Sequence, residues 1–167
     1  MQAILDMNAA PSVSVKRGGH TVWRFMARRL HPWKLVTADV DGDGRREIIL
    51  GVYKATRFRP YPHPCLFVYG WTSKGIFPKW RGSALSKPFG DFTFVPCAGT
   101  AREELAAVEV KADGNRCITT YHWSGFGFSG DTQFGSWKTA HIRASHRNEV
   151  LVVADGRIRS FKVETTQ

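Results

Sequence analysis

Three short aliphatic runs, each opened by a glutamate, recur along the chain and constrain its fold more than any other feature. They cover residues 47–52, 104–108 and 149–153, so their glutamates stand 57 and 45 residues apart. Runs of this length, rich in Ile, Leu and Val, are typical of buried strands. A unit that returns at such intervals indicates a repeat architecture.

An aromatic-rich strand follows each of these runs, at residues 67–71, 119–123 and 160–163. Two of these strands carry a Tyr-x-Trp frame, and the frames lie 52 residues apart. Asp-Gly, Ser-Gly and Gly-Gly pairs between the strands are typical of turns. The nearest approach to a helix, residues 25–30, ends at His31-Pro32. The sequence therefore predicts an all-β protein.

The repeat length matches the four antiparallel strands of a β-propeller blade. We expect about three blades, near residues 34–85, 88–135 and 136–164, in a single repeat domain over residues 12–167. Residues 12–30 would add one or two further strands, and residues 1–11 would be disordered or loosely attached. The alternative is a β-sandwich, in which strands also recur at short intervals.

The stretch D-V-D-G-D-G-R-R-E, residues 39–47, concentrates four carboxylates in a chain with 24 Lys and Arg against 14 Asp and Glu. Asp39, Asp41 and Asp43 alternate with other residues, so a tight turn presents all three to one centre. Their mutual repulsion is relieved when a cation lies among them. A hard cation such as Ca²⁺ prefers such oxygen ligands, while Gly42 and Gly44 allow the backbone to curve.

This stretch resembles the calcium loop of FG-GAP and VCBS repeats, the blades of integrin-α-type propellers and of many bacterial surface proteins. The family pattern, D-x-D-G-D-G-x-x-D/E before an aliphatic strand, is met at every position. The resemblance implies one Ca²⁺ site, in which Asp39, Asp41 and Asp43 are side-chain ligands. It further implies that the backbone carbonyl of Arg45 is a ligand and that Glu47 closes the site.

The equivalent loops of the other two predicted blades lack ligands. Their ligand positions hold Pro96, Ala98 and Thr100 in one loop and His141, Arg143 and Ser145 in the other. An EF-hand is excluded, because its twelfth position, which must be a bidentate Glu, is Leu50, and strands rather than helices flank the loop. One calcium ion per chain is therefore expected.

A net charge of +10 favours contact with polyanions. The basic residues are nevertheless spread along the chain, which is typical of a solvated surface. No apolar run is long enough to span a membrane, and the N-terminus has no basic region of a signal peptide. The resemblance implies a cell-envelope or extracellular location. Cys65, Cys97 and Cys117 follow no disulfide or zinc spacing and are interpreted as structural thiols.

No catalytic motif is present. The six histidines lack metalloprotease spacing, and neither Ser124 nor Ser129 lies in the G-x-S-x-G frame of a nucleophile elbow. No spacing among the remaining carboxylates favours a glycosidase pair. We therefore expect a protein that is not an enzyme.

Aromatic residues offer a possible ligand surface for sugars or acidic polymers. Its members would be Tyr69, Trp71, Trp80, Tyr121, Trp123 and Trp137. The alternative is that these side chains fill the space between blades, as most large aromatic residues do.

The sequence thus predicts a non-catalytic, calcium-binding, propeller-like module that binds protein or carbohydrate. The strand at residues 20–29 would complete the last blade of its own chain or of a partner. In the second case two half-propellers would form a homodimer; the chain could also pack against other propeller blades. Polyanion binding, to acidic polysaccharide or, less favoured, to nucleic acid, is one alternative function, and a fragment of a carbohydrate-active enzyme is another.

Overall fold

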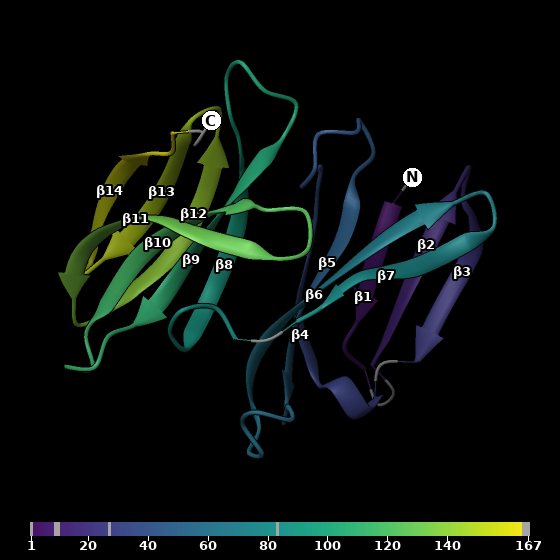
Figure 1. Ribbon diagram of the computed structural model, residues 1–167, viewed down its shortest axis with the longest axis horizontal. Helices are drawn as coiled ribbons and strands as arrows, with labels where there is room; N and C mark the ends of the chain where they lie inside the picture. Colours follow the sequence, from purple (N-terminus) through teal and green to yellow (C-terminus); the bar gives the residue numbers. More distant parts are fainter. Residues whose placement is uncertain (1, 9–10, 27, 83, 165–167) are drawn as a thin grey trace. The chain divides into compact units, whose positions relative to one another are not determined.

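The computed structural model describes residues 2–8, 11–26, 28–82 and 84–164. Within them the chain forms fourteen strands and a 3-10 helix, η1 (Arg28–Leu30) (Figure 1). The strands are β1 (Gln2–Asp6), β2 (Ser12–Arg17), β3 (His20–Met26), β4 (Pro32–Ala38), β5 (Glu47–Lys54), β6 (His63–Thr72), β7 (Gly75–Arg81), β8 (Phe89–Pro96), β9 (Glu103–Val110), β10 (Arg116–Trp123), β11 (Phe128–Trp137), β12 (Ala140–His146), β13 (Glu149–Ala154) and β14 (Arg157–Lys162). The predicted all-β class is confirmed. The described residues contain no helix with the length and apolar composition needed to span a bilayer.

The strands form four antiparallel sheets, each made of strands that follow one another along the chain. Their orders are β1-β2-β3, β4-β5-β6-β7, β8-β9-β10-β11 and β12-β13-β14. The last three cover the segments in which the sequence predicts blades near residues 34–85, 88–135 and 136–164.

The chain divides into two compact units, each built from two sheets around its own core. Unit 1 comprises residues 1–37 and 46–84, and unit 2 comprises residues 38–45 and 85–167. In unit 1, Val13 and Val15 of β2 pack with the inward row of β5, namely Ile48, Leu50 and Val52. In unit 2, side chains of β8, β9 and β10 share one core with Val150, Val152 and Ala154 of β13.

The three aliphatic runs that begin with a glutamate form the central strands β5, β9 and β13. The first six residues of β5 and the first seven of β9 are buried, so both faces of these strands are covered. The outer strand β14 is exposed at five of its six positions and carries three basic residues. In the last three sheets an uninterrupted apolar run thus forms a central strand, while the outer strand β14 has a mixed sequence.

The N-terminal segment differs from the prediction in two ways. First, Gln2–Asp6 form β1, which pairs with β2 from Gln2↔Lys16 to Asp6↔Ser12 instead of being disordered. Ala3 and Leu5 explain this difference, because they pack against the core of unit 1. Residues 1, 9 and 10 lie outside the described residues.

Second, the strand predicted at residues 20–29 does not complete the last sheet. His20–Met26 form β3, which pairs with β2 from Arg17↔His20 onward. Gly18 and Gly19 close this hairpin with φ of 56° and 83°, and two such glycines favour a two-residue turn. The short hairpin costs less chain entropy than a pairing with a distant strand. Residues 28–30 form η1, and residue 27 lies outside the described residues.

Candidate metal centre

The loop between β4 and β5 curves around the side chain of Asp39. Its Oδ1 accepts a hydrogen bond from the Gly42 N–H at 2.7 Å, and its Oδ2 accepts one from the Gly44 N–H at 2.8 Å. Both glycines have φ near 80°, a region that other residues rarely adopt. The Asp-Gly-Asp-Gly sequence therefore folds locally into a turn centred on one carboxylate.

This turn brings three carboxylates together. One oxygen from each of Asp39, Asp41 and Asp43 lies within 4.8 Å of the other two. Oxygens at about 2.4 Å from one Ca²⁺ ion are at most about 4.8 Å apart, so the three side chains fit a single calcium shell. Asp39 is buried and the other two are exposed, which leaves the centre open to solvent.

Glu103, at the start of β9, fixes the backbone of Asp39. The Glu103 N–H donates to the Asp39 carbonyl at 2.8 Å, and the Asp39 N–H donates to Glu103 Oε1 at 3.3 Å. Both residues are 7% exposed. Two hydrogen bonds with Glu103 therefore hold the loop on unit 2. The sequence pattern does not reveal them, because Glu103 lies just before the aliphatic run at residues 104–108.

Glu47 is not a member of the three-carboxylate group. Its buried carboxylate, on β5, accepts a hydrogen bond at 2.8 Å from Lys79 Nζ, on β7, across the intervening strand β6. The Arg45 N–H donates to Asp43 Oδ1 at 2.8 Å. The structure thus assembles the three aspartates, whereas the roles of the Arg45 carbonyl and of Glu47 as ligands stay predictions.

The equivalent loops contain no comparable cluster. Within the part of the chain that the structure describes, no other group of three His, Cys, Asp or Glu side chains comes as close together. This agrees with the residues at the equivalent positions, which include none of the carboxylates that the first loop supplies.

The predicted aromatic ligand surface does not form as a single face. Tyr121, Trp123 and Trp137 are 2%, 7% and 9% exposed and belong to the interior of unit 2, so the core-filling alternative applies to them. Strand aromatics on a covered face are buried to maximise apolar contact. Tyr69, Trp71 and Trp80, in unit 1, are half-buried.

The half-buried aromatics have distinct surroundings. Trp71 donates its indole N–H to the Arg46 carbonyl at 3.2 Å and lines a small cavity of about 190 Å³ together with Trp23. Tyr69 instead lines a larger cavity of about 510 Å³ with Phe25 and Phe67. Two separate hollows therefore replace the continuous surface.

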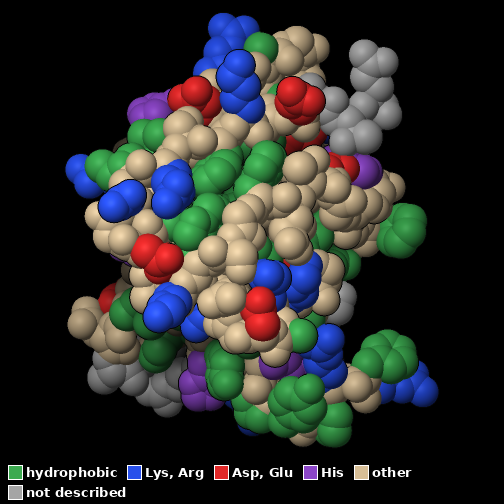
Figure 2. Space-filling view, turned by 90° about the vertical axis from the view of Figure 1, so that its left-hand side faces the viewer, with side chains coloured by type: hydrophobic (Ala, Val, Ile, Leu, Met, Phe, Trp, Pro, Cys, Tyr) green, Lys and Arg blue, Asp and Glu red, His purple; other side chains and the backbone are tan. Residues whose placement is uncertain are grey.

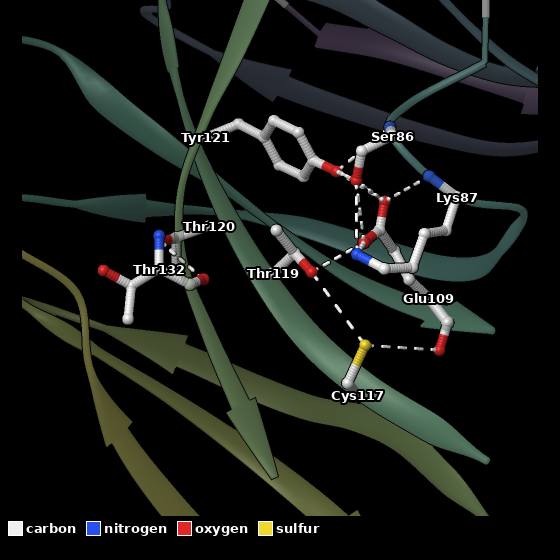
Figure 3. A network of polar contacts seen from close by, with 8 residues as sticks. All are labelled: Ser86, Lys87, Glu109, Cys117, Thr119, Thr120, Tyr121 and Thr132. Atoms are coloured by element: carbon white, nitrogen blue, oxygen red, sulfur yellow. Dashed lines mark hydrogen bonds and ion pairs between the residues drawn. The ribbon is translucent and has the colours of Figure 1, made fainter. Parts of the chain in front are cut away.

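A second polar cluster, centred on Glu109, lies in unit 2 (Figure 3). Its fully buried carboxylate accepts hydrogen bonds from the Tyr121 hydroxyl, and from Thr119 Oγ1 at 2.6 Å. Ser86 Oγ and Lys87 Nζ also reach it, at 3.2 and 3.3 Å. Burial and the hydrogen bond to Glu109 raise the pKa of Tyr121 above its ordinary value. These hydrogen bonds and the lysine compensate the burial of the Glu109 carboxylate. Because Ser86 and Lys87 precede β8 while Thr119 and Tyr121 belong to β10, the cluster also connects the segment before β8 to β9 and β10.

A His–Asp pair lies on the sheet β8–β11. His122 Nδ1 and Asp131 Oδ1 are 2.6 Å apart.

Glu104 is 1% exposed, and its Oε1 has no hydrogen-bond partner among the described residues. Burial raises the pKa of the Glu104 carboxyl, although the charges of Arg102 and His122 oppose that change.

On the face that Figure 2 shows, the charged side chains do not gather into one patch. Figure 2 shows Lys and Arg side chains scattered over the face in view, with Asp and Glu side chains between them. This pattern does not by itself identify a ligand.

Comparison with known proteins gives no family assignment. No family model, curated protein or solved structure matches the chain.

Proposed function

We propose that this protein is a non-catalytic calcium-binding module, in which one Ca²⁺ ion is held by the loop at residues 39–45. The observation that carries the proposal is the convergence of Asp39, Asp41 and Asp43 within the diameter of one calcium shell. Three like charges this close repel one another unless a cation neutralises them. The resemblance to FG-GAP and VCBS loops supports the same ion.

The ligand set that we propose consists of the three aspartate side chains and the carbonyl of Arg45. Glu47 is left out of this set because it does not belong to the three-carboxylate group and its Oε1 is paired with Lys79. Calcium suits the site better than magnesium, because the latter demands a strict octahedron. The bound ion would supply the positive charge that keeps the exposed Asp41 and Asp43 beside the buried Asp39.

Calcium would act here as a structural brace. The backbone of Asp39 already forms two hydrogen bonds with Glu103. An ion bound to Asp39 would therefore hold the loop in the conformation that makes these contacts with the start of β9. The proposed whole is a propeller-type repeat scaffold, supported by four consecutive antiparallel sheets. Such a scaffold would bind protein or carbohydrate rather than perform a reaction.

Isothermal titration calorimetry tests the calcium proposal. The informative variant is Asp41→Asn with Asp43→Asn, because both side chains are exposed and Asp39, which organises the turn, is left intact. We expect one Ca²⁺ per wild-type chain and no heat of binding in the variant. At 100 times its Kd, calcium should raise the free energy of unfolding by about 2.7 kcal/mol.

Asp113→Asn is the matched control, since Asp113 also precedes a glycine in an exposed turn but stands outside the carboxylate cluster. This control should bind calcium as the wild type does. Equal melting temperatures of the wild-type protein in calcium and in EGTA would contradict the proposal.

A further inference from the structure

The net positive charge of the protein comes from one of its two units. Unit 1 contains 13 Lys and Arg against two acidic residues, Asp6 and Glu47, which gives a net charge of +11. Unit 2 contains 11 Lys and Arg against 12 acidic residues, which gives −1. The overall charge of +10 therefore does not describe a uniform basic surface, and any anionic partner is directed to unit 1.

Unit 1 also has a groove that combines basic and aromatic side chains. The cavity, of about 510 Å³, is lined by residues from β3, η1, β5, β6 and β7. Its three rings are Phe25, Phe67 and Tyr69, and its three cations are Arg29, Lys54 and Arg81. Among the described residues that line it, there is no Asp, Glu, Asn or Gln.

The groove lies at the end of the core-facing side of the sheet, where charged residues take the place of apolar ones. Alternate residues of β5 point inward, and the row Ile48, Leu50 and Val52 continues in Lys54. Arg81 of β7 lies directly opposite Phe67 of β6, so both side chains emerge on the same side of the sheet. Two cations thus stand beside a core aromatic ring.

In the part of the chain that the structure describes, no carboxylate neutralises these cations. Among the described residues neither Arg29, Lys54 nor Arg81 forms an ion pair, and Lys54 Nζ lies 5.5 Å from the centroid of the Phe67 ring. Like charges that share one groove repel, and an anion bound between them removes that repulsion. The lining is therefore complementary to a negatively charged ligand.

The rings indicate what else the ligand contains. The centroid of Tyr69 lies 6.4 Å from that of Phe25 and 6.3 Å from that of Phe67, so the three form one aromatic wall. Phe25 and Tyr69 are half-buried and offer ring surface to a ligand. Flat unsaturated rings stack on such side chains, as unpaired bases do in proteins that bind single strands.

A second aromatic feature lies beyond Lys54, in the loop between β5 and β6 (Figure 1). Phe58 is 90% exposed and stands between Arg57 and Arg59. The turn that presents it is closed by two backbone hydrogen bonds between Thr56 and Arg59, at 2.9 and 3.2 Å. Phe58 thus offers an exposed ring beside two cations in unit 1.

We propose that unit 1 binds single-stranded nucleic acid, with phosphates against Arg29, Lys54 and Arg81 and a base stacked on Phe25 and Tyr69. An acidic polysaccharide fits less well, because the lining lacks the carboxylates and amides that hydrogen-bond to sugar hydroxyls. Duplex DNA fits less well, because its bases are not free to stack. The inference is independent of the calcium proposal, since the aspartate loop belongs to unit 2.

Fluorescence anisotropy with a labelled 15-nucleotide oligo-dT, in 50 and 200 mM salt, tests this inference. The groove variant is Lys54→Gln with Arg81→Gln. The control is Arg24→Gln with Lys74→Gln, which removes the same two charges from exposed positions of unit 1 outside the groove. We expect the groove variant to lose affinity by about tenfold or more and to reduce the salt slope by about 1.4, against less than about threefold for the control.

Phe25→Leu tests the stacking separately, because it keeps an apolar side chain and removes the ring. We expect a loss of about tenfold with no change in the salt slope. Equal losses in the groove and control variants, or full affinity of Phe25→Leu, would overturn the inference. So would tighter binding of heparin, of duplex DNA, of a mononucleotide or of phosphatidylserine vesicles than of oligo-dT. Unchanged circular dichroism and melting temperature show that each variant is folded.

Discussion

Glu104 is a buried acidic residue whose carboxylate is only partly compensated. Its side chain is 1% exposed, and Oε1 has no hydrogen-bond partner among the described residues. Burial raises the pKa of this carboxyl above the ordinary value of 4.5. Ionised Glu104 is therefore more costly in the folded chain than in the unfolded one.

This burial predicts a pH-dependent effect of Glu104→Gln, which replaces the carboxylate with a neutral group of the same size. Below the unfolded-state pKa, Glu104 is protonated in both states and contributes no penalty. As pH rises through the folded-state pKa, the penalty becomes complete and wild-type stability falls relative to the variant. The variant should therefore gain free energy of unfolding over the wild type from pH 4 to pH 7.

Urea unfolding at the two pH values measures this gain. Glu164→Gln is the control, because Glu164 is exposed, and its difference from wild type should change little with pH. If Glu104→Gln differs from the wild type by the same amount at both pH values, burial of the charged form is not what sets its effect.

At the scale of elements, the N-terminal strand β1 is held by one row of side chains. Ala3 and Leu5 face the core of unit 1, and Leu5 is half-buried. Leu5→Ala removes three carbon atoms from this contact and should lower the free energy of unfolding by about 1–2 kcal/mol. Gln2→Ala, which truncates an exposed residue of the same strand, should change it by less than about 0.5 kcal/mol. Urea titration of both variants checks this, and similar values for the two would mean that β1 is not docked through Leu5.

The strength of each local signal explains how much of the fold could be predicted. The unbroken apolar run in residues 48–52 indicates a central strand on its own, and β5 is one. Residues 2–6 give a weaker signal, because Asp6 interrupts the run and the stabilising contacts come from Val13 and Val15. The pairing of β3 with β2 depends on the Gly18-Gly19 turn. Closing this short turn costs less chain entropy than pairing β3 with the distant strand that the sequence pattern suggests.

The candidate sites divide in the same way. The aspartate loop is encoded in nine consecutive residues, so its convergence could be predicted from spacing alone. The groove of unit 1 joins five elements, and no short segment contains its pattern. Burial of Tyr121 and Trp123 could not be predicted either, since a Tyr-x-Trp strand looks the same whether its face meets solvent or another sheet.

At the scale of the whole molecule, each of the four open sheets ends in two edge strands, and unprotected edges pair with other chains. Bulges interrupt the pairing of the edge strands β3, β7, β8, β11 and β12 with their neighbours. The edge strand β14 pairs with β13 without a bulge but is exposed and carries Arg157, Arg159 and Lys162. Charge rather than geometry therefore protects this edge.

Arg157→Thr with Lys162→Thr should consequently promote association. Arg159 is retained because its guanidinium lies over the Trp137 ring at 5.8 Å. Threonine favours strands, so the variant keeps β14 while removing the repulsion between like edges of two copies. Light scattering should give a wild-type mass that does not change with concentration and a variant mass that rises with it.

Lys138→Thr with Arg147→Thr is the control, since it removes two charges from exposed positions outside the strands. If this control associates as strongly as the β14 variant, net charge rather than the edge keeps the chains apart. The same measurement tests the homodimer predicted from the sequence, because a wild-type mass near 18.8 kDa excludes it and twice that mass supports it. Within the described sheet β3 pairs with β2 alone, so its outer edge is the one through which the dimer predicted from the sequence would form.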